Sequence, residues 1–469
     1  MSKSAAAWLP KLKKGQGPLY KAIADAIAAD IATGRLAPEQ RLPPQRQLAD
    51  ALDIDFTTVA RAYGEAHKRG LVDSTVGRGT FVCGRRAMAI PRAVAGRPNV
   101  DLSMNMPPEA LTPELAALMR AGVASLGESP AAMQALLRYQ DFGGSAQDRE
   151  AGALWLRRRG LAVEPERLLV APGAQAALLA ILSTIAPPGS VVCCEALTYP
   201  GLRALAGVLN LRLVGLPMDG EGIDALAFAA ACTQYAPQAL YCTPTLLNPT
   251  TLTMSPQRRQ AIVQVARHYK VPIIEDDAYG FLPREGVAPI AAIGADITFH
   301  VAGLAKCIGA GLRLAYVSAP DAADTARLAA ALRATAVMAS PFTAALATRW
   351  IRDGTADLAL NAIRKESMAR QRLAARILPA GSYASQPEAF HLWLRLPPQW
   401  DRLAFTAHLR ATGIGVVPSD AFAVDGGGPA PQAVRVCIGG VATQEQLRHA
   451  LQRIADAMLE APLVVPAVL

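Results

Sequence analysis

The sequence of 469 residues lacks the features that mark a membrane or a secreted protein. Apolar residues make up 52% of it, but no run approaches the roughly 20 uninterrupted apolar residues of a membrane span. The opening segment MSKSAAAWLPKLKKG has no long apolar stretch before a cleavage site, so no signal peptide is expected. These absences predict a cytoplasmic protein without a membrane partner.

Cysteine and histidine are also scarce. The seven cysteines include one adjacent pair, Cys193 and Cys194, and the others are scattered, as are the six histidines. Neither residue type recurs at a zinc-binding spacing, and the cysteines do not resemble a disulfide framework. The sequence therefore predicts a reducing compartment and no metal site.

Acidic residues are few in the segment where basic residues gather. Residues 1–99 hold 16 lysines and arginines against 8 aspartates and glutamates, a balance of +8, whereas the whole chain carries +9. A basic first fifth joined to a nearly neutral body is typical of a polyanion-binding module attached to a part with another task. A basic tail that only keeps the protein soluble would give the same charge, so the residue pattern has to decide.

The first eighty residues predict three helices followed by a β-hairpin. Isoleucines at spacing four (Ile23, Ile27, Ile31) predict a first helix that stops near Gly34. A second, short helix follows the segment LPP. The segment DIDFTTVARAYGEAHKRG predicts a turn and a third helix that stops at Gly70, and LVDSTVGRGTFV predicts two strands around a glycine turn. Three helices followed by a wing describe a winged helix-turn-helix, whose last helix enters the major groove of DNA.

The resemblance then becomes specific. The order PLYxxIAxxI, GRLxPxxRLPPxRxLAxxL, TTVxRAY and RGLVxxxxGRGTFV, over residues 17–83, resembles a GntR-type DNA-binding domain, which we place at residues 1–83. Phe56 departs from it, because many relatives carry a polar or basic residue there, and contact with a thymine methyl group is one hypothesis. A winged helix that contacts only protein is the alternative. The residues that the resemblance assigns to DNA are Arg46, Thr57, Thr58, Gly77, Arg78 and Gly79.

A linker and a larger body follow. Residues 84–99 contain two prolines and several arginines without periodicity, which predicts a semi-stiff linker. From residue 100 to 469, short strand-like runs such as RLLVAPG, QALYCTPT, VPIIEDDAYGF and DITFHVAGLAK alternate with helical stretches. This alternation predicts α/β layering around a mainly parallel sheet.

The body also carries a lysine that needs partners. Lys306 stands in the apolar segment HVAGLAKCIGAGLRLAYV, with Arg313 seven residues on. Asp276 ends a strand-like run, and APGAQAAL forms a strand-to-helix turn whose free N–H groups favour a phosphate. A lysine, an acid, a phosphate-binding helix start, an aromatic residue and an arginine are the parts that pyridoxal 5′-phosphate (PLP) requires.

In their order and spacing these residues resemble the fold-type I aminotransferases, over about residues 100–455. The resemblance implies that Lys306 forms a Schiff base with PLP and that Asp276 meets the ring nitrogen. It assigns Arg435, in AVRVCIGG, to a substrate carboxylate. The other residues that it assigns to the cofactor are Asn248 and Tyr279 at the ring hydroxyl, Tyr199 stacked on the ring, and Arg313, Ala174 and Gln175 at the phosphate. A degenerate aminotransferase-like shell is the alternative.

A GntR-type winged helix joined to a fold-type I aminotransferase-like domain resembles the MocR family of transcriptional regulators. The resemblance implies a homodimer on operator DNA, with Tyr139 reaching the neighbouring cofactor. It also implies an amine or amino acid effector that exchanges with the imine at Lys306. Two alternatives stay open: a working PLP-dependent aminotransferase with a DNA-binding extension, and a DNA-binding module whose body serves only dimerisation. The residue types do not exclude the first.

Overall fold

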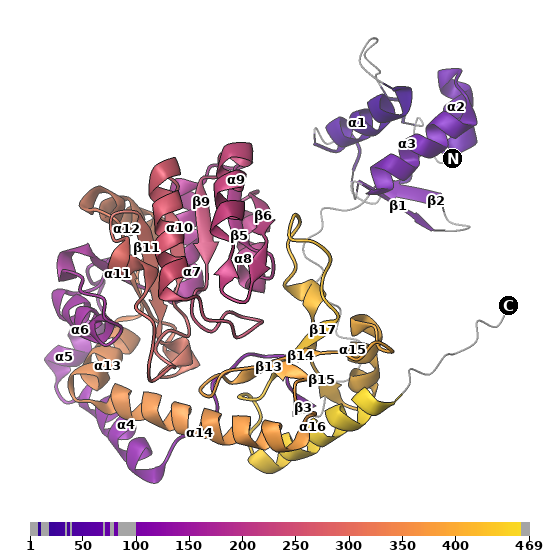
Figure 1. Ribbon diagram of the computed structural model, residues 1–469. Coiled ribbons are helices and arrows are strands. Elements are labelled where there is room, and N and C mark those ends of the chain that lie inside the picture. The colour runs from indigo at the N-terminus through magenta and orange to yellow at the C-terminus, as the bar shows by residue number, and fades with distance from the viewer. Residues whose placement is uncertain are drawn as a thin grey trace, which may run out of the picture. The chain divides into compact units, whose positions relative to one another are not determined.

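The computed structural model describes residues 8–10, 18–32, 35–37, 40–68, 71–75, 79–82 and 100–460. The chain forms two compact units, Met1–Gly96 and Arg97–Leu469 (Figure 1). The predicted linker, residues 84–99, lies outside the described residues.

In its described residues, the smaller unit holds three helices and a two-stranded antiparallel sheet. Its helices are α1 (Leu19–Ala32), α2 (Gln45–Leu52) and α3 (Phe56–Lys68), and its strands are β1 (Val72–Thr75) and β2 (Gly79–Val82). Ile23 and Ile27 of α1 are fully buried together with Val59 of α3, so the isoleucine stripe faces the third helix. Asp55 starts α3 by accepting a hydrogen bond from the Thr57 backbone N–H at 2.7 Å. The predicted winged helix-turn-helix arrangement is therefore present.

The larger unit is built on a seven-stranded sheet with the strand order β4-β12-β11-β10-β9-β5-β6. All neighbouring pairs are parallel except those that β12 makes with β11 and with β4. The strands are β4 (Leu168–Ala171), β5 (Val191–Glu195), β6 (Arg212–Leu216), β9 (Ala239–Cys242), β10 (Ile273–Asp276), β11 (Thr298–Gly303) and β12 (Ala315–Ser318). The predicted mainly parallel sheet is confirmed.

Helices cover both faces of this sheet. The face covered by α7 (Ala174–Ile185), α8 (Pro200–Val208) and α12 (Ala322–Ala336) buries one apolar cluster. The opposite face, covered by α9 (Ala225–Tyr235), α10 (Pro256–Tyr269) and α11 (Ile290–Ile293), buries another. Since side chains alternate along a strand, the adjacent Cys193 and Cys194 point into different clusters.

A four-stranded antiparallel sheet forms a second layer, with the order β13-β14-β17-β16. The long helix α14 (Thr355–Ile377) runs from the large sheet toward it, as Figure 1 shows. Its strands are β13 (Tyr383–Ala384), β14 (His391–Arg395), β16 (Val417–Pro418) and β17 (Ala433–Cys437). The remaining elements of this unit are β3 (Val100–Asp101) paired with β15 (Ile414–Gly415), the hairpin β7 (Met218–Asp219) and β8 (Gly222–Ile223), and the helices α4 (Pro113–Ser125), α5 (Pro130–Leu136), α6 (Ala146–Arg157), α13 (Pro341–Arg352), α15 (Arg402–Ala411) and α16 (Gln444–Leu459).

No helix among the described residues has both the length and the apolar character needed to cross a membrane. Within the same ranges, no group of three or more histidine, cysteine and acidic side chains is arranged to hold a metal ion.

Candidate functional site

The predicted cofactor residues converge on one edge of the seven-stranded sheet. Strands β4, β5, β9, β10 and β11 run in one direction, so the residues that follow them meet at their carboxyl ends. Arg313 reaches the same edge from the other direction, because it precedes the antiparallel β12, whose Ala315 pairs with Gly303 and with Ala171. The one reversed strand therefore supplies the predicted phosphate arginine.

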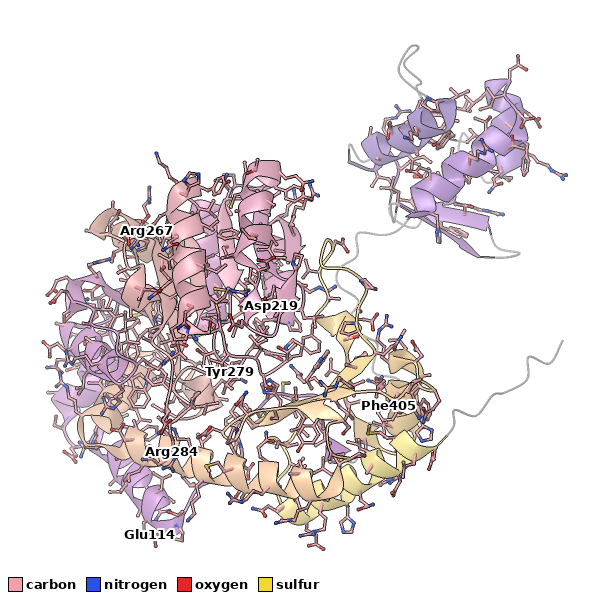
Figure 2. All side chains as sticks on the ribbon, in the orientation of Figure 1. Glu114, Asp219, Arg267, Tyr279, Arg284 and Phe405 are labelled. Carbon is pink, nitrogen blue, oxygen red and sulfur yellow. The ribbon has the colours of Figure 1, made fainter. Side chains whose placement is uncertain are left out.

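This edge opens into a cavity of about 460 Å³. Pockets of this size accommodate small organic ligands. Tyr279, at its wall, lies in the middle of the larger unit, between the two sheets (Figure 2). The cavity is lined by every predicted cofactor and effector residue: Ala174, Gln175, Tyr199, Asn248, Asp276, Tyr279, Lys306, Arg313 and Arg435.

Lys306 ends a short 3₁₀ turn, Leu304–Lys306, directly after β11. Its Nζ donates a hydrogen bond to the backbone oxygen of Asn105. Burial lowers the pKa of the Lys306 amine to about 8, and the nearby Arg435 and Arg313 act in the same direction. The amine therefore spends more time neutral, and so nucleophilic, than an exposed lysine at the same pH.

Asp276 and Asp277 are neighbours with different surroundings. Asp276 lines the cavity; Tyr241 donates to its Oδ2 at 2.8 Å, while Oδ1 has no partner among the described residues. Burial raises the pKa of Asp276 to about 6, although the Tyr241 hydrogen bond lowers it. Asp277 points away from the cavity into a bidentate pair with Arg159, at 2.9 and 3.1 Å, and lies 3.3 Å from His300 Nε2. Burial alone would raise the pKa of Asp277, but Arg159 and His300 hold it below its usual range.

The amino end of α7 has the geometry of an anion-binding cradle. Gly173 precedes this 12-residue helix with φ 95°, in the left-handed region that favours glycine, and no side chain of the described residues caps the helix. A Cβ on Gly173 would lie 3.3 Å from an Arg313 guanidinium nitrogen, so the cation stands directly beside the helix end. Free N–H groups, the helix dipole and an arginine together suit a phosphate.

Arg435, the predicted carboxylate residue, is buried in β17 and already engaged. It donates to Asn248 Oδ1 at 2.7 Å and to the backbone oxygen of Ser103, and its guanidinium lies over the Phe422 ring. Its Nε has no partner within the described part of the chain, so donors remain for a ligand. Because arginine can only donate, Asn248 must turn its oxygen toward Arg435, which leaves the Asn248 amide nitrogen for the cavity.

Asn105 and His391 are among the residues in and beside this site that were not predicted from the sequence. Asn105 lies in the segment between β3 and α4, residues 102–112, which we call the strap, and it lines the cavity. Its Nδ2 donates to the Tyr279 hydroxyl at 2.9 Å. His391, fully buried at the start of β14, lies 3.3 Å from the same Nδ2. Neither residue stands in a segment with a strand-end or turn signal, so only the tertiary fold reveals them.

The smaller unit shows part of the predicted DNA-contacting surface. Arg46 and Thr57 are exposed and Thr58 is half-buried, all on α2 or the start of α3. The Arg46 guanidinium lies 6.0 Å from the centre of the Phe56 ring, and 44% of Phe56 is exposed. The Thr57 hydroxyl donates to Asp55, so it can only accept further hydrogen bonds.

The predicted wing tip is described in part. Gly79 starts β2 with φ 111°, beside the Arg41 side chain. Gly77 and Arg78 lie outside the described residues. Tyr139 is 79% exposed and does not line the cavity of its own chain.

Comparison with known proteins identifies both units. Residues 19–82 match the bacterial regulatory proteins of the gntR family, and residues 97–454, more than half of the chain, match aminotransferase class I and II. The chain is 28% identical over 446 residues to the uncharacterized HTH-type transcriptional regulator YdeF of Bacillus subtilis, with 95% of each chain covered. It is 25% identical over 331 residues to the probable rhizopine catabolism regulatory protein MocR of Rhizobium meliloti, with 65% of this chain and 66% of that protein covered. The chain belongs to the MocR-type transcriptional regulators.

Solved structures agree with the fold of the larger unit of this MocR-type regulator. It resembles the kynurenine aminotransferase of Pyrococcus horikoshii, solved in complex with PMP, with a TM-score of 0.69 and 21% identity. The match covers 78% of this chain and 91% of that one. The predicted combination of a GntR-type winged helix and a fold-type I domain is confirmed.

Proposed function

We propose that this MocR-type regulator binds PLP at Lys306, senses a small primary amine or amino acid there, and changes its grip on operator DNA in response. The observation that carries the proposal is the single cavity that gathers Lys306, an unpaired buried oxygen of Asp276 and an uncapped helix end beside Arg313. These three features are complementary to the aldehyde, the protonated ring nitrogen and the phosphate of one cofactor.

The residues around the cavity fit the cofactor group by group. The α7 N–H groups and Arg313 hold the phosphate, and the unpaired Oδ1 of Asp276 accepts the ring N–H. A cationic partner there also removes the cost of burying the Asp276 charge. Asn248, whose oxygen is held by Arg435, donates its amide N–H to the ring oxygen, and Tyr199 covers the ring face.

Binding of the effector uses the same residues. When bound, PLP supplies an aldehyde carbon with which primary amines condense. The lowered pKa of Lys306 allows its amine to leave and return near neutral pH. The free Nε–H of Arg435 receives the effector carboxylate, if one is present. The effector class is therefore a small primary amine, and most readily an amino acid.

DNA binding belongs to the smaller unit. Arg46, Thr58 and the start of α3 present donors and acceptors for phosphates and base edges, in a segment that carries most of the net positive charge of the chain. A regulator of this kind acts in the cytoplasm, where the DNA is.

We also propose a homodimer. Large apolar side chains are exposed on α4 and in the segment that follows α5, among them Leu118, Val123, Leu137 and Tyr139. Met104, at the mouth of the cavity, is 61% exposed on the same chain. A second copy packed here would cover these side chains and bring Tyr139 toward the partner's cavity. Light scattering should then give twice the 49.3 kDa chain mass.

The test is Lys306→Ala in the full-length protein. The wild type, reconstituted with PLP, should absorb visible light, and the variant should lose that absorption while keeping its unfolding temperature and its affinity for DNA from its own upstream region. Wild-type DNA binding should fall steeply with salt, because lysines and arginines release phosphate counterions. A visible band that survives in the variant would contradict the role of Lys306.

The same preparations separate the alternatives. A protein that binds no DNA at low salt and transfers amino groups rapidly to a keto acid is an aminotransferase with an extension. A protein that binds DNA but never PLP uses its body only for dimerisation.

A further inference from the structure

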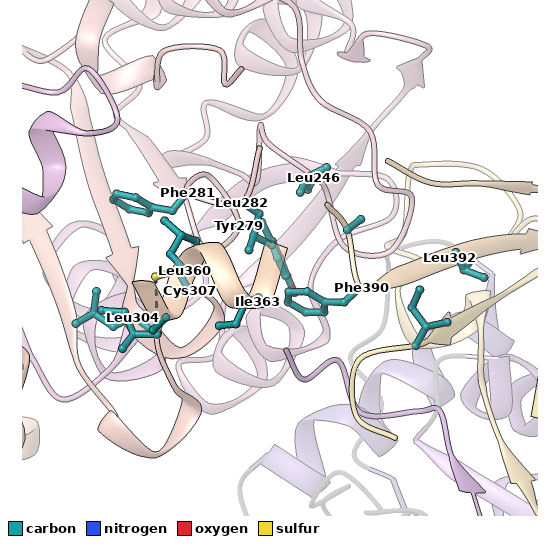
Figure 3. Packing of buried hydrophobic residues seen from close by; sticks show 14 of the residues in the cluster. Leu246, Tyr279, Phe281, Leu282, Leu304, Cys307, Leu360, Ile363, Phe390 and Leu392 are labelled. Carbon is teal, nitrogen blue, oxygen red and sulfur yellow. Dashed lines mark hydrogen bonds between the residues drawn. The ribbon is translucent and has the colours of Figure 1, made fainter. Parts of the chain in front are cut away.

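The Tyr279 hydroxyl is held by Asn105, and Asn105 is held in turn by His391. Tyr279 is buried, and its ring lies 6.0 Å from that of Phe390 in the same apolar cluster, which fixes the plane of the phenol (Figure 3). Its oxygen receives a hydrogen bond from Asn105 Nδ2 at 2.9 Å, and the other short contact of that Nδ2 is His391 Nδ1, at 3.3 Å. Both hydrogens of the amide are in use when His391 Nδ1 is an acceptor.

The backbone sets the direction of this chain of hydrogen bonds. His391 Nε2 lies 3.5 Å from the backbone oxygen of Leu247, which can only accept. The proton of a neutral imidazole must then be on Nε2, so Nδ1 is an acceptor and Asn105 must turn its nitrogen toward it. The reverse amide orientation would place a lone pair of Nε2 against the Leu247 oxygen.

The charges around His391 keep it neutral. Burial lowers the pKa of His391 to about 3, and Arg435 and Lys306 act in the same direction. Tyr279 faces Arg435, Asp276, Cys437 and Tyr199, and burial raises its pKa above its usual range, so it keeps its proton. A neutral histidine and a protonated tyrosine are the states that the hydrogen-bond directions require.

The consequence concerns the proton of Tyr279. Its oxygen already accepts from Asn105, and the nearby acceptor, His391 Nδ1, is occupied by the same amide. The O–H is left to point into the cavity that Tyr279 lines. We propose that Asn105 and His391 are a positioning pair that holds the Tyr279 hydroxyl as a hydrogen-bond donor to the phenolic oxygen of the cofactor. This inference rests on the proposed binding of PLP.

Asn105 and His391 should together set the pH midpoint at which the visible absorption band of the bound cofactor titrates. A hydrogen bond donated to the phenolic oxygen of the cofactor stabilises the anionic form of that oxygen. It therefore lowers the pH midpoint at which the protonated, visible-absorbing chromophore loses its proton. In Asn105→Ala, His391 Nδ1 is freed and competes for the Tyr279 proton. In Asn105→Asp, the new carboxylate accepts a hydrogen bond from the Tyr279 hydroxyl directly. Both variants should raise the pH midpoint of the visible band by about 1 unit, since a hydrogen bond to a charged group is worth about that much.

The experiment is a pH titration of the visible absorption of PLP-loaded, full-length protein. Asn105→Ala and Asn105→Asp are made in the wild type and again in Tyr279→Phe, which has no hydroxyl to position. For Asn105→Ala we expect the shift in the wild-type background and none in the Tyr279→Phe background, and for Asn105→Asp a larger shift in the wild type than in Tyr279→Phe, where only the added charge acts. Asn361→Asp, on the exposed side of α14, repeats the chemical change away from the cavity and should leave the midpoint unchanged.

The outcomes distinguish failure of the Asn105–His391 inference from failure of the proposed PLP binding. An equal shift in both backgrounds would mean that Asn105 acts on the pocket without Tyr279, and no shift in either would mean that it does not act on the chromophore; each overturns the inference. A wild-type protein that shows no visible band with PLP overturns the proposed function instead.

Discussion

At the scale of single residues, two adjacent carboxylates show how environment sets chemistry. Asp276 and Asp277 have the same side chain, yet the pKa of the first is raised and that of the second is lowered. The alternation of a strand places one toward the cavity and the other toward Arg159. Substitution of Asp276 should therefore affect mainly cofactor binding, and substitution of Asp277 mainly the stability of the fold.

Asp276→Asn should weaken cofactor binding at least tenfold with little loss of stability. Burial raises the pKa of Asp276 to about 6, so above that pH its charge destabilises the folded state relative to the unfolded state. The neutral asparagine of the variant removes this cost. Asp277→Asn should lower the unfolding temperature strongly, because it deprives the buried Arg159 of its charged hydrogen-bond partner, a loss of about 3–5 kcal/mol. Thermal unfolding of the apoprotein and PLP titration check both; the opposite assignment of the two effects would contradict the site.

Residues such as these were accessible to sequence reasoning because their signals are local. Asp276 and Lys306 each follow a short apolar run, and parallel strands bring such positions together. Asn105 was not accessible, because its role depends on the strap after β3, on β14 and on β10 being adjacent. The preference of the Arg435 side chain for Asn248 and Ser103 likewise follows only from the packing of separate segments.

At the scale of elements, the start of α3 exposes an apolar ring, Phe56, beside the polar side chains Arg46 and Thr57. Phe56 is its first residue, and the aliphatic and aromatic surfaces of Arg46 and Phe56 lie together. The sequence predicted this helix and offered a thymine-methyl contact of Phe56 as a hypothesis. It did not predict that Asp55 would hold the Thr57 hydroxyl, which reduces the donors available to DNA.

Phe56 should read thymine methyl groups. A duplex selected from random DNA by the full-length protein is resynthesised with uracil in place of each thymine, which deletes only the methyl. At a contacted position the affinity should fall about fourfold, the value of one buried methyl-sized group. Phe56→Ala should abolish the difference, whereas Arg46→Ala should weaken thymine and uracil duplexes equally. A thymine preference that persists in Phe56→Ala would rule out this contact.

The element that sequence reasoning described least well is β12. Alternation of strands and helices predicted a mainly parallel sheet, but no local signal marks β12 as antiparallel. Its reversal decides the geometry of the site, because it is the reason that Arg313 stands beside the amino end of α7.

At the scale of the whole molecule, effector and DNA should each change the affinity of the protein for the other. A ligand shifts an equilibrium only if it binds two arrangements with different affinity, and coupling of about 1–3 kcal/mol is typical. A sensed amine should therefore alter DNA affinity about 5- to 150-fold, and DNA should alter amine affinity by the same factor. Lengthening residues 84–99 with glycine and serine should reduce this factor while leaving both binding events in place.

Titration of candidate amines against the visible band, with and without DNA, measures both directions. Lys306→Ala serves as the control, since its DNA affinity should not respond to amines. An amine that saturates the wild-type cofactor, is turned over rapidly and leaves DNA affinity unchanged would mean that the body acts as an enzyme.

The strap that carries Met104, Asn105 and Met106 has an evolutionary consequence. These residues line the cavity, yet they belong to no helix or strand. The buried pair of Arg159 and Asp277, on the far side of β10, leaves far less freedom to vary. Descendants of one ancestral regulator could thus acquire new effectors by drift at Met104 and Met106, while Asn105 between them, which contacts Tyr279, and the scaffold beneath stay under purifying selection.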